Sequence, residues 1–157
     1  MLNCVRKAST FMKIMAQHRN EIKPQNFQYF LVLDFEANCQ EGARLDPQEI
    51  IEFPCIMVDS QTFQTMNVFH EYVRPVGVPT LTHFCTELTG ITQDMVESKD
   101  TFDKVLDKFQ LWYSEQGLTP DNSSFVTCGL WDLADMLPKQ CEYSGMGEVE
   151  VGLLSKI

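Results

Sequence analysis

The residues best placed to do chemistry are two carboxylates, Asp34 and Glu36, which follow an apolar run at positions 29–33. In an extended strand, side chains two positions apart point to the same face, while Phe35 between them points to the other. Neighbouring carboxylates at the end of a buried strand repel each other unless a cation lies between them. Oxygen ligands of this kind suit Mg²⁺ or Mn²⁺ better than zinc. The alternative is an ordinary edge strand whose acidic side chains face solvent.

A third carboxylate, Asp132, follows a short apolar strand expected at residues 124–128. Asp is a favoured helix N-cap because its oxygen accepts a backbone N–H bond, so capping of the next helix is the simpler interpretation. The other interpretation is that the strand end brings Asp132 beside Asp34 and Glu36. Three oxygen ligands that converge from separate elements can hold two divalent ions, the arrangement used for phosphodiester hydrolysis.

The elements that must position these residues indicate one α/β domain of 157 residues. Apolar runs and turn residues predict four strands, of which the first three form an antiparallel meander, and two helices, the second kinked or shortened by Pro138. The predicted strands cover residues 29–37, 50–58, 68–73 and 124–128, and the predicted helices cover residues 101–112 and 132–141. This order predicts an α/β sheet with an antiparallel side.

Composition and charge exclude some classes of protein. The 44% hydrophobic content is typical of a globular chain, and no apolar run approaches the length of a membrane span. The six cysteines form no C-x-x-C pair, so we interpret them as reduced core thiols of an intracellular protein, in the cytoplasm or nucleus. Residues 1–23 carry a net charge of +4 and the remainder carries −14. An acidic domain of this kind can bind RNA only if divalent cations offset its repulsion of the RNA phosphates.

The basic N-terminal segment has two interpretations. It carries apolar residues among its charges and faintly resembles an organellar transit peptide, or it is a plain solvated extension. Pro24 and the polar residues after it separate this segment from the first strand. We therefore expect an N-terminal extension over residues 1–26, a folded domain over residues 27–145 and a divergent tail over residues 146–157.

Four segments of the domain are informative in their order. They are Leu-Asp-Phe-Glu-Ala at 33–37, Pro-Gln-Glu-Ile-Ile-Glu-Phe-Pro at 47–54, Phe-Cys-Thr-Glu-Leu-Thr-Gly-Ile at 84–91 and Phe-Val-Thr-Cys-Gly-Leu-Trp-Asp-Leu at 125–133. Together they resemble the DEDDh 3′→5′ exonucleases and, within them, the enhanced-RNAi exoribonuclease group. The resemblance implies an RNase H-like fold, single-stranded RNA 3′ ends as substrate and two Mg²⁺ or Mn²⁺ ions.

The resemblance also implies roles for particular residues. Asp34 would ligate both ions, Glu36 would ligate one, and Asp132 would help to hold the second. Leu88 and Thr89 match the segment that contacts the terminal nucleotide. Their alternative roles are structural, with Leu88 in the core and Thr89 capping a turn. The side chain of Phe35 would lie in the core while its backbone lines the site.

The third motif of the resembled family, a histidine followed by an aspartate, has no counterpart after Asp132. The only histidines are His18, His70 and His83, and for His83 we expect a surface or packing role. We also expect the last sheet strand and the closing helix of the fold to be absent. Three hypotheses stay open: a weak or inactive exoribonuclease domain, a non-catalytic module that binds RNA ends or a protein, and an unstable truncated isoform.

Overall fold

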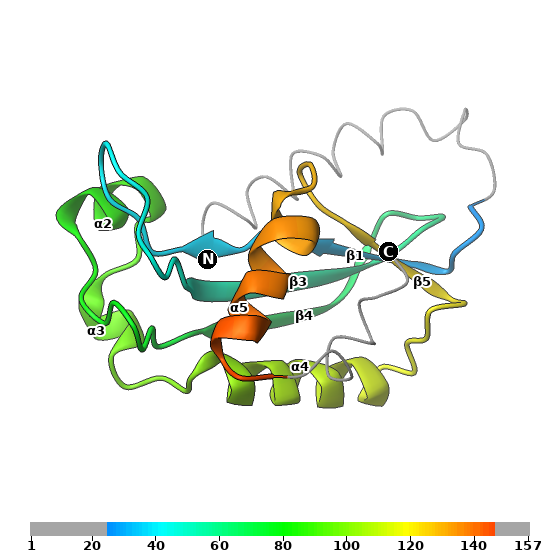
Figure 1. Cartoon of the computed structure of the whole chain (residues 1–157). Coiled ribbons are helices and arrows are strands. Elements are labelled where there is room, and N and C mark those ends of the chain that lie inside the picture. The colour runs from blue at the N-terminus through cyan, green and yellow to red at the C-terminus, as the bar shows by residue number, and fades with distance from the viewer. Residues whose placement is uncertain (1–24, 147–157) are drawn as a thin grey trace.

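A computed structural model describes residues 25–146 of the chain, which are built around one mixed five-stranded sheet (Figure 1). The strands are β1 (Tyr29–Leu33), β2 (Glu36–Ala37), β3 (Ile50–Asp59), β4 (Thr65–Tyr72) and β5 (Ser123–Val126). Strand β3 pairs antiparallel with β1, β2 and β4, whereas β5 pairs parallel with β1. The predicted α/β class and the antiparallel meander are therefore confirmed.

The first predicted strand is interrupted where the carboxylates lie. Instead of one strand over residues 29–37, the chain leaves β1 after Leu33 and resumes pairing at Glu36 in β2. Strand β1 pairs with the second half of β3, and β2 pairs with the first residues of β3. The prediction of one continuous strand was wrong, because the pairing with β3 lapses at residues 34–35. Glu36 resumes it in the register of β1, and the register shifts only between Glu36 and Ala37.

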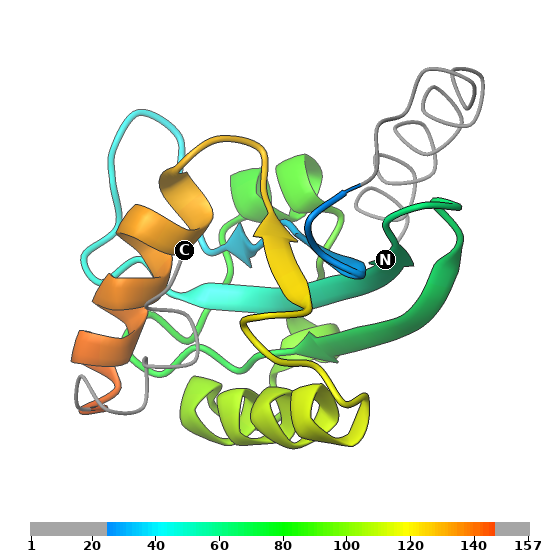
Figure 2. The same cartoon turned by 90° about the vertical axis from the view of Figure 1, so that its right-hand side faces the viewer.

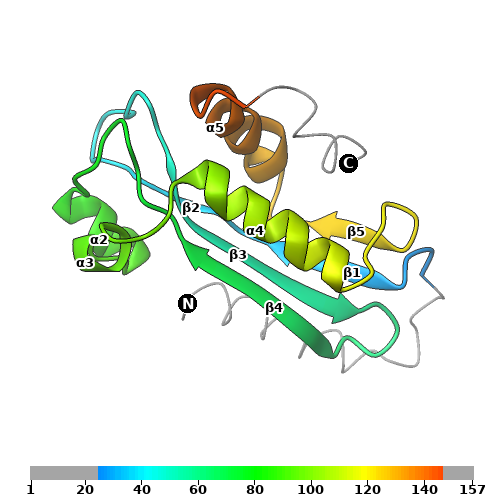
Figure 3. The same cartoon turned by 90° about the horizontal axis from the view of Figure 1, so that it is seen from below.

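Helix α4 (Phe102–Glu115) crosses one face of the sheet, as the spacing of its apolar residues predicts (Figure 3). Its buried positions include Phe102, Val105, Leu106 and Phe109, which confirms that these residues belong to the core. Two short helices that the sequence analysis did not identify, α2 (His83–Thr89) and α3 (Gln93–Val96), lie together at the end of the sheet where β3 begins (Figures 1 and 3).

The predicted helix over residues 132–141 is two helical segments. The first is a π-helical turn, η2 (Trp131–Met136), and the second is the α-helix α5 (Leu137–Tyr143), both visible in orange in Figure 2. The N–H of Leu137 donates to the carbonyl of Asp132, five residues earlier, which is the π pattern. Pro138 is the second residue of α5, which follows η2 without a gap and runs on to Tyr143, so the prediction that Pro138 cuts the helix short is wrong and the predicted kink stays a prediction.

The aromatic core lies between the sheet and α4. Phe53 of β3 is fully buried, and its ring centroid lies 4.8 Å from that of Phe35 and 4.7 Å from that of Phe109. A separate, smaller cluster around Ile56 and Val58 includes Phe63 from the turn before β4. The Phe35–Phe53 contact fixes which face of the sheet Phe35 occupies, and the position of both neighbouring carboxylates follows from it.

No helix within residues 25–146 is long and apolar enough to cross a membrane. The proposed N-terminal extension and tail fall almost wholly outside these residues. Their boundaries, the two interpretations of the basic segment and the state of Cys4 therefore stay predictions.

Replacing Phe53 by alanine should lower the free energy of unfolding by about 3–5 kcal/mol, because a fully buried ring is exchanged for a cavity. Leu111→Ala on α4 is the matched control, since Leu111 is 60% exposed and its loss should change stability by at most about 0.5 kcal/mol. Urea unfolding followed by circular dichroism measures both. Equal effects of the two substitutions would contradict the described core.

Candidate functional site

The break between β1 and β2 directs two carboxylates away from the core. Phe35 is 3% exposed, and its ring packs edge-on against Phe53 on the α4 side of the sheet. Because side chains alternate along an extended backbone, Asp34 and Glu36 point to the opposite side, where each is partly exposed. The prediction that Phe35 lies in the core is confirmed, and the shared face of the two carboxylates follows from it by alternation.

Asp132 comes to this position from a distant part of the sequence. Parallel pairing of β1 with β5 sets Val126 beside Val32, so the chain that leaves β5 runs on past the end of β1. Asp132 is 3% exposed, and its Oδ1 accepts a hydrogen bond from the backbone N–H of Phe35 at 2.8 Å. The third carboxylate is therefore fixed at the residue that separates the first two.

The simpler interpretation of Asp132 as a helix N-cap is wrong. The N-cap of η2 is Leu130, and no side chain makes a capping hydrogen bond there. Asp132 lies inside the first turn, with its Oδ1 directed to β1 instead.

The chemistry of these side chains fits a hard divalent cation, because carboxylate oxygens are the ligands that Mg²⁺ and Mn²⁺ prefer. The three carboxylates do not lie close enough together to count as a metal-binding group. Within residues 25–146, no three side chains among the histidines, cysteines, aspartates and glutamates form a group that could hold an ion. The side chains are thus of the right chemical type for such an ion, whereas metal binding belongs to the proposal below.

Leu88 and Thr89 lie at the end of α2. Leu88 is 61% exposed, so its alternative role in the core is wrong. Thr89 Oγ1 donates to the carbonyl of Cys85 at 2.8 Å and accepts from the N–H of Ile91 at 3.1 Å, which confirms its turn-capping role. The intervening Gly90 has φ +77°, a conformation that favours glycine.

Helix α2 is tied to the chain that follows β2. Thr82 caps α2 by accepting the N–H of Cys85, and its hydroxyl donates to the carbonyl of Cys39 at 2.6 Å. Because Cys39 lies three residues after Glu36, this bond holds the exposed Leu88 on the element next to the carboxylates.

The two described histidines both have carboxylate partners. His83 has an 86% exposed side chain whose Nε2 lies 3.3 Å from Glu87, which confirms its surface role. His70 is in β4, where its Nε2 lies 2.6 Å from Glu52 Oε1. His18 lies outside the described residues.

Glu49 is among the most buried charged residues, and its role was not predicted from the sequence. Its carboxylate oxygens accept N–H bonds from Val76, Gly77 and Val78 at 2.7, 2.8 and 2.9 Å, and so anchor the loop after β4. The side chain is 2% exposed. The role of Glu49 is structural. A local sequence pattern could not predict this role, because the residues that Glu49 binds lie 27 to 29 positions away.

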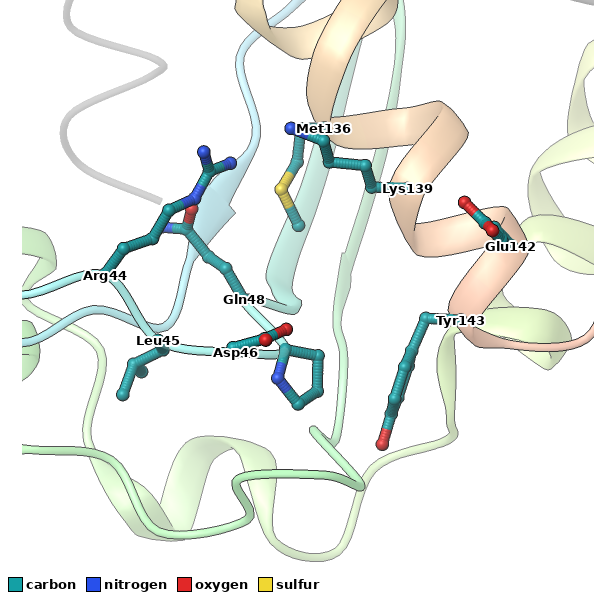
Figure 4. A pocket seen from close by; sticks show the side chains of 9 residues that line it. Arg44, Leu45, Asp46, Gln48, Met136, Lys139, Glu142 and Tyr143 are labelled. Carbon is teal, nitrogen blue, oxygen red and sulfur yellow. The ribbon is translucent and has the colours of Figure 1, made fainter.

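A hollow of about 670 Å³ lies between the loop before β3 and α5 (Figure 4). Its lining mixes charges of both signs, with Arg44 and Lys139 beside Asp46 and Glu142. None of the three candidate carboxylates lines it. The hollow is therefore distinct from the candidate site.

The cysteines only partly match the expectation of core thiols. Cys55, Cys85 and Cys141 are buried, but Cys39 is partly exposed and Cys128 is exposed, so the interpretation is wrong for Cys128. All five described cysteines are free.

Known proteins resemble this chain in sequence. The model of the RNase T family, described as exonuclease, matches residues 31–150. Human ERI1 exoribonuclease 3 is 50% identical over 125 residues, which are 78% of this chain and 37% of that protein. Human 3′-5′ exoribonuclease 1 is 39% identical over 134 residues, which are 84% of this chain and 38% of that protein. The chain thus spans well under half the length of these curated relatives.

Solved structures agree with the sequence comparison. The nuclease domain of 3′hExo, a DEDDh family member bound to rAMP, has a TM-score of 0.74 at 38% identity, covering 80% of this chain and 64% of that one. Cell-death related nuclease 4 (CRN-4) has a TM-score of 0.73 at 32% identity, covering 77% and 42%.

The chain belongs to the RNase T-like exonucleases of the DEDDh type and, within them, to the ERI1 exoribonuclease family. The predicted RNase H-like fold is confirmed with it.

Asp132→Ala should lower the free energy of unfolding by about 1–3 kcal/mol, because the buried N–H of Phe35 loses its acceptor. Asp132→Asn retains an oxygen at the same place and should lose less. Urea unfolding of both variants measures the difference. Equal destabilisation by alanine and asparagine would show that the hydrogen bond does not hold this part of the site together.

Cys39 should react slowly with iodoacetamide at pH 8. Burial, the neighbouring Cys85 thiol and the Glu36 carboxylate together raise the pKa of Cys39 to about 12, so only a minute fraction is the reactive thiolate. Timed alkylation of the folded chain, read by peptide mass spectrometry, should label the exposed Cys128 first. Labelling of Cys39 as fast as Cys128 would contradict this environment.

Proposed function

We propose that this chain binds the 3′ ends of single-stranded RNA at a carboxylate site of the two-metal nuclease type. The hydrogen bond between Asp132 and the backbone of Phe35 carries the proposal, because it brings a third carboxylate to the residue between Asp34 and Glu36. The similarity to a nuclease domain described as bound to rAMP supports a nucleotide as the ligand class.

The proposed metal ligands are the three carboxylates. Asp34 ligates both Mg²⁺ or Mn²⁺ ions, Glu36 ligates one and Asp132 helps to hold the second. When bound, such ions supply an activated water and stabilise the leaving oxygen of a phosphodiester. They also offset the repulsion between an RNA phosphate and a segment of net charge −14.

The proposed contact with the terminal nucleotide is the end of α2. Leu88 presents an exposed apolar side chain, 61% accessible, against which a base or ribose can pack. Thr89 sets the turn that ends the helix, and the Thr82–Cys39 bond keeps α2 beside the carboxylates. The backbone of Phe35 forms the floor of the site.

Turnover by these 157 residues is proposed to be weak or absent. In nucleases of the DEDDh type, a histidine serves as the general base for the attacking water. In these 157 residues no histidine follows Asp132. His70 and His83 are occupied by Glu52 and Glu87. The absence of a general base typically lowers the rate by about 10²–10⁴-fold.

The second candidate function, non-catalytic binding of RNA ends, is favoured by the same distribution of histidines. A site that keeps the carboxylates and the nucleotide contact but not the base would hold a 3′ end without releasing the terminal nucleotide. The two candidates differ only in turnover, so one assay separates them.

The test uses 5′-labelled single-stranded RNA with the purified chain in Mg²⁺, with and without EDTA. We expect RNA binding that weakens in EDTA and in the Asp34→Asn/Glu36→Gln variant, with little shortening of the RNA on a gel. A matched RNA that ends in a 3′-phosphate should bind less well, because the proposed site takes a free 3′ end.

Two outcomes would contradict the proposal. Robust Mg²⁺-dependent shortening that Asp34→Ala abolishes would refute the weak turnover. Equal binding in Mg²⁺ and in EDTA, unaffected by the two carboxylate substitutions, would refute the metal site itself.

A further inference from the structure

Glu52 of β3 lies directly across the sheet from a candidate metal ligand. In the antiparallel pairing of β2 with β3, the register partner of Glu36 is Glu52. Directly opposed residues have their side chains on the same face of the sheet. Glu52 therefore faces the same side as Asp34 and Glu36, away from α4, and it is only 3% exposed.

Two opposed carboxylates are unfavourable, because like charges across a strand pair repel and a buried charge needs a partner. One partner of Glu52 is His70, whose Nε2 lies 2.6 Å from Glu52 Oε1 and whose side chain is 15% exposed. A carboxylate only accepts hydrogen bonds, so the imidazole is the donor. The ring of His70 is itself held edge-on against Tyr72, 4.9 Å away.

The direction of this contact matters for Glu36. His70 belongs to β4, on the far side of β3 from β2, so its hydrogen bond holds the Glu52 carboxylate toward β4. Held there, Glu52 keeps its negative charge on the carboxylate face without turning toward Glu36.

We propose that Glu52, held by His70, is a positioning residue for Glu36: its fixed charge opposite Glu36 strengthens the attraction of this face for a divalent cation. In this proposal Glu52 is not itself a ligand, and it acts through the negative charge that it holds on the face of Glu36. This inference rests on the proposed function, because it requires that Asp34 and Glu36 bind a metal ion.

The neighbour of His70 provides a matched control. Glu71 follows it in β4 and points to the other face, where its Oε2 lies 3.4 Å from Nζ of Lys108 in α4. Glu71→Gln therefore removes one negative charge from the same strand on the opposite side of the sheet. Glu52→Gln removes one from the carboxylate face and keeps an oxygen that can accept from His70.

The test is Mn²⁺ binding by the full chain, measured without RNA by calorimetry or from the spectrum of the free ion. We expect Glu52→Gln to bind Mn²⁺ about tenfold more weakly, because it removes one negative charge from the face that attracts the cation. Glu71→Gln should bind as the unaltered chain does. His70→Phe, which has no donor for Glu52, should weaken binding, and His70→Gln, which has one, should restore part of it.

The outcomes separate this inference from the proposed function. Unchanged Mn²⁺ affinity in Glu52→Gln, or an equal loss in Glu71→Gln, overturns the role of Glu52 while Asp34 and Glu36 still bind the ion. Failure of the unaltered chain to bind Mn²⁺, or binding that Asp34→Asn/Glu36→Gln leaves intact, overturns both. Thermal melting of each variant shows whether an affinity change reflects loss of the fold.

Discussion

The hydrogen bond from the Phe35 N–H to Asp132 is the contact on which the candidate site depends. It joins residues 97 positions apart and connects the end of β1 to the first turn of η2. Both groups are buried, so neither exchanges its partner for water without cost. Together with the parallel pairing of β1 and β5, this bond places Asp132 beside the residue that separates Asp34 from Glu36, which come from the other end of the domain.

The rest of the sheet follows from the two faces that Phe35 separates. On the α4 side, the rings of Phe35, Phe53 and Phe109 pack into the core and supply stability. On the other side, the same alternation exposes Asp34 and Glu36 to a ligand. A shift of β1 by one residue would exchange these roles, so the aromatic core that stabilises the domain also sets the register of its candidate site.

The sequence predicted those features that depend on local periodicity. The alternation at residues 34–36 gives the correct buried position of Phe35, and the apolar spacing of α4 gives the correct buried residues.

Features set by distant partners were missed or misjudged. Capping was the simpler interpretation of Asp132 from the sequence, because its bond to Phe35 joins residues 97 positions apart. Leu88 is exposed because α2 lies at the edge of the domain. The pairing of Glu52 with His70 depends on the register of β3 with β4, which no local pattern specifies. The helical segments α2, α3 and η2 are too short for their periodicity to be read.

The most direct measurement of the central claim is a crystal structure of the chain grown with Mn²⁺ and a nucleoside 5′-monophosphate, with anomalous scattering used to locate the metal. The account predicts a manganese peak within coordination distance of Asp34 and Glu36, on the face of the sheet opposite α4, with the nucleotide phosphate beside it. Manganese bound elsewhere on the acidic surface, with none at these two carboxylates, would contradict it.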